Sequence, residues 1–349
     1  MHLYNSVSRI EIESNTFDRV AWLDAARAFG IYAIYLGHFG EAAGPAYRFV
    51  FQFHVPLFFF LAGCTENYNR EESLLKNVKR NIKTILLPAY FFAIMSLIIY
   101  VINANADLAE ACIWGQLIIK GLVRNTYLAA SLWFLTCLFA VKTIFALLKK
   151  TKKWYWLVAA GIFMFLIAEY GMSPRPIDSP KYYYNLDSAC YYMHFYIGGF
   201  LLYPCIKEWM EKTGSLAKSA KTVIAVGLLG YAGLMYFRIN VLSYIPIHNM
   251  IADSGLRMLK TYLMIGAVIM LAYYLQEIEL LAKVGQDTLY LCGSEYMIKI
   301  VVPSICGIVG LAINLDGPLY VCIYTIMLLW AGEKIFVPWE KNFITKMRK

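Results

Sequence analysis

Long apolar runs recur from one end of this chain to the other, and they constrain its fold more than any other feature. Each run has about 17 to 22 residues, the length that an α-helix needs to cross a bilayer. Hydrophobic residues make up 60% of the sequence and charged residues 16%, whereas soluble domains are about half apolar and about a quarter charged. No polar stretch is long enough for a separate soluble domain. The sequence predicts an all-α, polytopic helical bundle that forms a single domain over residues 1–349.

About ten transmembrane helices are expected. They cover residues 20–40, 45–64, 82–102, 129–148, 154–170, 189–206, 222–238, 258–276, 287–305 and 317–335. Glu295 and Lys299 interrupt the ninth, where they lie one turn apart and can form an ion pair inside the bundle. The segment "DLAEACIWGQLIIKGLVRN" is expected to form a short helix on the outer surface.

Lysine and arginine alternate between the loops. They are concentrated in segments 70–83, 149–153, 206–221 and the C-terminal tail, and they are sparse in the loops between these segments. Basic loops lie on the cytoplasmic side of membrane proteins. The pattern predicts a multi-pass membrane protein with both termini in the cytoplasm, and we expect its membrane to be a bacterial inner membrane. It also explains the net charge of +9 without nucleic-acid binding.

The first apolar run carries two ionisable residues on one face. Arg27 and His38 are eleven residues apart, so at 3.6 residues per turn they share a stripe and are separated by roughly 16 Å. Asp24 lies one turn before Arg27 and can pair with it. Charged groups inside a span are costly unless they face protein or water, and they usually mark function. We expect this stripe to face the bundle interior, although a plain interfacial ion pair and an outer histidine cap are the structural alternative.

The second run places His54 near the middle of its span, two residues before Pro56. A proline inside a helix kinks it and frees a carbonyl. Because the turn between the two spans is short, His54 can approach His38, and the two could act as a general base and its partner. Alternatively, His54 binds a freed carbonyl and serves packing alone.

These residues carry a resemblance to a known family. "WLDAARAFGIYAIYLGH", followed by "FVFQFHVPLFFFLAGC", resembles the membrane acyltransferase-3 family, whose signature is an arginine or lysine, ten residues, and a histidine on the first span. The second stretch is similar to the branch named for fucose O-acetylase. Weaker similarities are "VKRNIKTILLPAYFF", "SLWFLTCLF" and "VGQDTLYLCGSEY". In the last of these, Glu295 stands where family members often have a histidine.

The resemblance implies transfer of an acyl group, usually acetyl, from acyl-coenzyme A to a hydroxyl of a surface polysaccharide or lipid-linked glycan. His38 is then the first choice for the base, with His54 as its partner, and Arg27 and Asp24 organise the site. The phosphates of coenzyme A could bind the basic helical face formed by Lys76, Lys79, Arg80 and Lys83. The same four residues could instead contact lipid as ordinary cytoplasmic charge.

The acceptor is expected to meet tyrosines in "KYYYNLDSACYYMHFY", with Tyr184, Asn185 and Asp187 and also Glu295 as candidate substrate-binding residues. Tyrosines are equally common as belt residues at membrane surfaces. No permanently bound cofactor is expected. The eight cysteines are scattered without metal-ligand spacing, so no metal site is expected either.

Two other function classes remain open at this point. Intramembrane arginine, histidine and glutamate also suit a proton-coupled transporter or flippase for a glycan or lipid, although the sequence lacks the internal repeat of many transporters. A non-catalytic membrane assembly protein is the other alternative. Consumption of acetyl-coenzyme A separates the enzyme from both.

Overall fold

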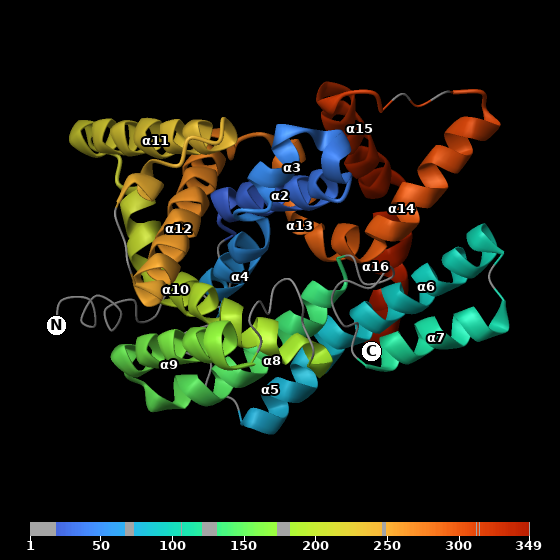
Figure 1. Cartoon of the computed structure of the whole chain (residues 1–349), viewed down its shortest axis with the longest axis horizontal. Coiled ribbons are helices and arrows are strands. Elements are labelled where there is room, and N and C mark those ends of the chain that lie inside the picture. The colour runs from blue at the N-terminus through green and yellow to red at the C-terminus, as the bar shows by residue number, and fades with distance from the viewer. Residues whose placement is uncertain are drawn as a thin grey trace.

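The structure is a computed structural model that describes residues 19–66, 73–105, 107–120, 131–172, 182–245, 249–311, 313 and 315–348. Within these residues the chain forms helices and no strands, which confirms the predicted all-α class. Three helices run on through π-helical segments, Ile82–Leu86, Ile167–Met172 and Gly332–Phe336. Figure 1 shows α2 across the middle of the molecule, between α11 and α12 on one side and α14 and α15 on the other.

The helices have the following bounds: α2 Ala21–Gly37, α3 Pro45–Val50, α4 His54–Cys64, α5 Leu74–Asn81, α6 Leu87–Ala104, α7 Leu108–Ile119, α8 Trp133–Leu148, α9 Trp154–Leu166, α10 Leu186–Glu211, α11 Ser215–Tyr236, α12 Met250–Leu275, α13 Glu279–Gln286, α14 Thr288–Ile308, α15 Pro318–Ala331 and α16 Val337–Arg348. The segment expected to form a short helix contains α7, whose place at the outer surface stays a prediction. The interrupted ninth span is one continuous helix, α14.

Seven helices in the described residues are long and apolar enough to cross a membrane, and these support a helical membrane protein. They are Pro45–Cys64, Leu74–Ala104, Trp154–Met172, Ser215–Tyr236, Met250–Leu275, Thr288–Ile308 and Pro318–Arg348. The count of about ten is not shown. The other three expected positions hold α2, α8 and α10, of which α2 has 17 residues and α8 has 16. Those two helices are about 26 and 24 Å long, which is shorter than the roughly 30 Å hydrocarbon core.

The outer faces of the helices are apolar. On α6, Ile94, Ile98 and Ile102 recur every four residues and are exposed, so they form one continuous apolar stripe. Similar exposed side chains lie on α11 and α15, including Val223, Val226 and Leu319. A soluble protein rarely exposes apolar surface on this scale, so these faces fit a lipid environment.

The helices around α2 approach one another through glycines. A Cβ atom at Gly63 of α4 would lie 2.0 Å from the Tyr196 carbonyl oxygen of α10, and one at Gly199 would lie 1.9 Å from the Phe60 oxygen. Small residues allow such close crossings in membrane bundles. Gly285 of α13 plays the same part, because a Cβ there would lie 1.8 Å from the backbone oxygen of Asp24. These contacts fix α4, α10 and α13 around the first helix.

The second expected span differs from the sequence prediction. Two helices, α3 and α4, replace one kinked helix, and His54 is the first residue of α4 rather than a residue in mid-helix. Pro56 is therefore the third residue of a helix, where its missing N–H removes no hydrogen bond. The expected proline kink was wrong, since the chain already breaks at residues 51–53.

Candidate active site

His38 forms a polar contact between two helices that are far apart in the sequence. It follows the last residue of α2, and its Nδ1 lies 2.7 Å from Oε1 of Glu295 on α14, 257 residues later in the chain. The Glu295 side chain is 3% exposed and that of His38 is 23% exposed. The carboxylate is thus enclosed in protein while the imidazole keeps an accessible edge. No local sequence pattern could have paired these two residues.

Lys299 completes this cluster. Its Nζ lies 2.8 Å from the same Glu295 oxygen, which confirms the expected ion pair one turn along α14. The ammonium also donates a hydrogen bond to the Tyr35 carbonyl at 3.0 Å and lies 4.5 Å from the centre of the Phe39 ring. It therefore supplies the countercharge that a buried carboxylate requires.

The cluster can present a base. An ionised carboxylate only accepts hydrogen bonds, so the proton between His38 and Glu295 belongs to Nδ1 of the imidazole. Nε2 then keeps a lone pair that can take a proton from a substrate. The other Glu295 oxygen, Oε2, is buried and has no hydrogen-bond partner among the described residues.

A cavity of about 280 Å³ lies along the helices that carry this cluster, although His38, Glu295 and Lys299 are not among its lining residues. Helices α2, α4, α8 and α14 and the π-helical segment before α6 enclose it. Its lining is mostly apolar and consists of Arg27, Ile34, Phe58, Leu61, Ala62, Thr65, Thr84, Ile85, Phe134, Leu135, Leu138, Lys142, Thr288, Leu289 and Cys292. We call Ile34, Phe58, Phe134 and Cys292 its apolar end. Its polar end consists of Arg27, Thr65, Thr84, Lys142 and Thr288.

Two helices connect the apolar end to the cluster. Ile34 lines the cavity, and His38 follows it by one turn of α2. Cys292 lines the cavity, and Glu295 follows it by three residues on α14. The backbone of Cys292 is held by Ser131, whose hydroxyl donates to its carbonyl oxygen at 2.7 Å. Of the predicted stripe on α2, Arg27 and the neighbouring Ile34 line the cavity, His38 lies one turn beyond its lining, and a role for the stripe in function stays a prediction.

Arg27 stands at the polar end with its predicted partner. Its Nη1 lies 2.9 Å from Oδ1 of Asp24, and Nε of Arg19 lies 2.6 Å from Oδ2. The Asp24 side chain is buried, and that of Arg27 is one-quarter exposed. One carboxylate thus pairs with two arginines. The three side chains together carry one excess positive charge, which lies beside the cavity.

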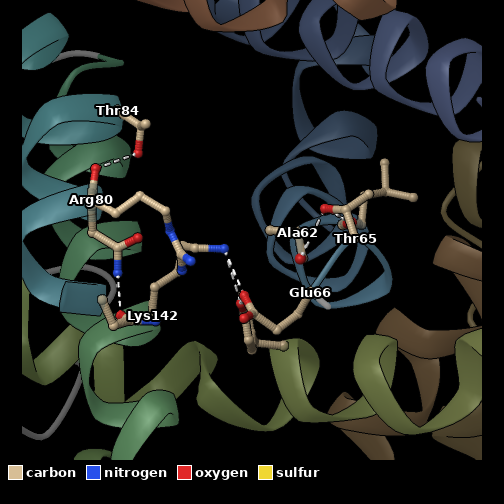
Figure 2. A network of polar contacts seen from close by, with 10 residues as sticks. Ala62, Thr65, Glu66, Arg80, Thr84 and Lys142 are labelled. Carbon is tan, nitrogen blue, oxygen red and sulfur yellow. Dashed lines mark hydrogen bonds and ion pairs between the residues drawn. The ribbon is translucent and has the colours of Figure 1, made fainter. Parts of the chain in front are cut away.

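A second polar network lies at the same end. Lys142 of α8 donates to Oε2 of Glu66 at 2.8 Å, and the Tyr196 hydroxyl donates to the same oxygen at 2.6 Å. Figure 2 shows Arg80 and Lys142 pointing toward Glu66 from their two helices. Burial by itself would raise the pKa of the Glu66 carboxyl, but the Lys142 ammonium, the hydrogen bonds from Lys142 and Tyr196, and Lys149 lower it overall. Sequence analysis missed Lys142 and Glu66, which no motif marks.

The second predicted histidine has a backbone partner. Nδ1 of His54 donates to the Val50 carbonyl at 2.7 Å, and its ring packs edge-on against Phe51. His38 thus contacts a carboxylate, whereas His54 contacts the last backbone carbonyl of α3. A catalytic role for His54 stays a prediction.

The basic helix α5 divides its four predicted phosphate ligands. Lys76 and Lys79 on α5 and Lys83 in the following π-helical segment are exposed, whereas Arg80 is half-buried and points toward Glu66. The Thr84 hydroxyl, on the cavity wall, donates to the Arg80 carbonyl at 3.0 Å. The four side chains therefore lie at and around the polar end, and their role stays a prediction.

The predicted acceptor residues lie at the start of α10. Asn185 and Asp187 are fully buried, and the Asn185 amide donates to the Thr136 hydroxyl at 3.0 Å. Tyr184 is half-buried, and its hydroxyl lies 3.1 Å from that of Tyr90. The contact with Thr136 gives Asn185 a structural role, and sugar binding by the three residues stays a prediction.

Comparison with protein families gives one match. The family model described as "Acyltransferase domain" matches residues 20–332, which include every helix of the site. No curated protein and no solved structure matches the chain.

Proposed function

Because the chain belongs to the acyltransferase-3 family, we propose that it is a membrane O-acetyltransferase. It would transfer the acetyl group of acetyl-coenzyme A to a hydroxyl of a surface or lipid-linked glycan. The 2.7 Å contact between His38 and Glu295, beside a cavity inside the bundle, carries the proposal. In the proposed reaction, His38 is the base at the point where the thioester meets the alcohol.

The residues present can perform the reaction without a covalent intermediate on the protein. Nε2 of His38 takes the hydroxyl proton as the acceptor oxygen attacks the thioester carbonyl carbon. The carbon–sulfur bond then breaks, and the imidazolium returns the proton to the departing thiolate. Glu295 holds the ring in the required tautomer and stabilises the imidazolium that forms.

The donor would enter at the polar end of the cavity. The helix ends around it adjoin the basic segments. By the positive-inside rule these segments and both termini would lie in the cytoplasm, and the membrane would be a bacterial inner membrane. Arg27, Lys142 and Arg80 are nearby cations for the donor phosphates, with Lys76, Lys79 and Lys83 outside them. The narrow pantetheine arm would lie along the apolar lining and bring the thioester toward His38.

The acceptor would approach His38 from the other end of α2. Its imidazole is partly exposed there, and Oε2 of Glu295 has an acceptor position to spare. A sugar hydroxyl can reach the imidazole there, whereas Oε2 is enclosed in protein. We retain Tyr184, Asn185 and Asp187 as the predicted contacts to the rest of the glycan, with Tyr184 the most accessible of the three.

The test is a transfer assay with purified protein, radiolabelled acetyl-coenzyme A and a lipid-linked glycan extract. We expect label in the glycan fraction, and a loss of about 10²- to 10⁴-fold in His38→Ala, with Gln52→Ala as a control on the same side of the bundle. Thermal unfolding in detergent would verify that both variants fold. Glycan transport into vesicles without consumption of the thioester would identify a carrier and overturn the proposal, as would full activity of His38→Ala.

A further inference from the structure

Lys142 lines the cavity and forms an ion pair with a nearly buried carboxylate. It lies in the second half of α8, its side chain is 19% exposed, and it lines the polar end. Its partner Glu66 is 10% exposed and lies just beyond the end of α4. Lys142 thus brings this ion pair to the wall of a partly open cavity, where an incoming ligand can reach the ammonium.

Glu66 can lose this lysine and keep a partner. The Tyr196 hydroxyl donates to the same oxygen at 2.6 Å, and Arg80 points toward the carboxylate from α5 (Figure 2). Release of Lys142 would therefore not leave a bare buried carboxylate, which is the usual cost of breaking such a pair. Lys142 also has a second contact, a 3.3 Å hydrogen bond to the Tyr196 hydroxyl, and that contact keeps it near the wall.

The charges at this end favour an anion. Lys142, Arg80 and Arg27 face two carboxylates, Glu66 and Asp24, and Asp24 is already shared with Arg19. A phosphate group offers several oxygens to lysine and arginine donors at once. We propose that Lys142 binds the phosphate groups of the donor, and that Glu66 is the exchangeable counter-ion that holds Lys142 in place while the cavity is empty.

This inference rests on the proposed function and deepens it, because it names a phosphate-bearing thioester as the donor class and places the phosphates at Lys142. The headgroup of an anionic lipid offers the same chemistry, so the experiment must separate the two sources. Coenzyme A and pantetheine serve as the probes, since pantetheine has the same arm without the phosphates. Neither carries an acyl group, so binding is measured without any reaction.

Binding would be measured by titration calorimetry on the full-length protein in nanodiscs of neutral lipid. We expect Lys142→Met to weaken coenzyme A binding by about tenfold or more and to leave pantetheine binding unchanged. Glu66→Gln should strengthen coenzyme A binding several-fold, because Lys142 is no longer shared. Lys150→Met is the matched control: this lysine is exposed, lies two turns further along, and does not line the cavity.

The double variant Lys142→Met/Glu66→Gln guards against misfolding, since it leaves no unpaired carboxylate. Coenzyme A binding as tight as in the wild type would overturn the inference, and so would an equal loss for pantetheine. Repeating the titration in nanodiscs with phosphatidylglycerol tests the lipid source. If coenzyme A affinity is independent of Lys142 and the lysine matters only with that lipid, the donor assignment is wrong. A protein that binds coenzyme A through Lys142 but transfers nothing would refute the transferase alone.

Discussion

At the scale of single residues, Lys299 determines whether His38 can act. Without its ammonium, the buried Glu295 carboxylate would take up a proton. A protonated Glu295 can donate to Nδ1 of His38 instead of accepting from it. The ring proton would then sit on Nε2, where the base is needed. We expect Lys299→Met to lower kcat by about 100-fold with little change in KM for the donor, measured as the initial rate of acetyl transfer.

A double-mutant comparison isolates this effect from damage to the fold. If Lys299 acts through Glu295, then Lys299→Met should cost no more than about twofold in a Glu295→Gln background, where no charge is left to compensate. Lys299→Arg should retain most of the activity. Equal losses from Lys299→Met in both backgrounds would show that the lysine acts by another route.

The distance between two residues along the sequence determines whether their contact could be predicted. Asp24 and Arg27 are one helical turn apart, so their pairing follows from α-helix geometry alone, and the structure confirms it. His38 and Glu295 come from opposite ends of the chain, and only the packing of α2 against α14 brings them together. Lys142 and Glu66 belong to the same class. Lysine and glutamate are ordinary near cytoplasmic helix ends, and no local sequence pattern indicates that these two form an ion pair.

At the scale of elements, the crossing of α4 and α10 fixes the position of α4, which lines the cavity. Gly63 and Gly199 leave no space for a methyl group against the facing backbone, and backbone atoms cannot move aside as a side chain can. We expect Gly63→Ala or Gly199→Ala to separate the helices, to lower the free energy of unfolding by about 1 to 3 kcal/mol and to enlarge the cavity. Thermal unfolding in detergent, together with coenzyme A affinity, would measure both effects.

Gly227 provides the matched control. It lies inside α11, and nothing stands within 4 Å of the position of its Cβ. There, alanine should be neutral or stabilising by about 0.5 to 1 kcal/mol, because glycine is the poorer helix former. If Gly63→Ala behaved like Gly227→Ala, close crossing of α4 and α10 would not be what positions the site.

Helix boundaries show where the pattern of apolar residues stops being informative. The positions of most helices follow from the apolar runs, because length and composition identify a span. The break between α3 and α4 does not, since residues 51–53, "FQF", contain no glycine or proline to mark it. The same applies to α2 and α8: the sequence predicts full spans, while their helices are short and largely enclosed by neighbours that belong to distant parts of the chain.

At the scale of the whole molecule, the proposal depends on which side of the membrane each end of the cavity faces. The polar end must face the cytoplasm, where acetyl-coenzyme A is found. Two exposed lysines test this. Lys120 follows α7 on the predicted outer side, and Lys150 lies in the predicted cytoplasmic segment 149–153. Each would be changed to cysteine in a Cys112→Ser background, because Cys112 is the cysteine whose side chain is exposed among the eight.

Intact cells would be treated with a membrane-impermeant maleimide before and after permeabilisation. We expect Lys120→Cys to react in intact cells and Lys150→Cys to react only after permeabilisation, because a charged reagent cannot cross the bilayer. The opposite pattern would put Lys142, Arg27 and the polar end outside the cell. Donor phosphates could not then reach them from the cytoplasm, and a bundle with the same internal contacts would need a different substrate.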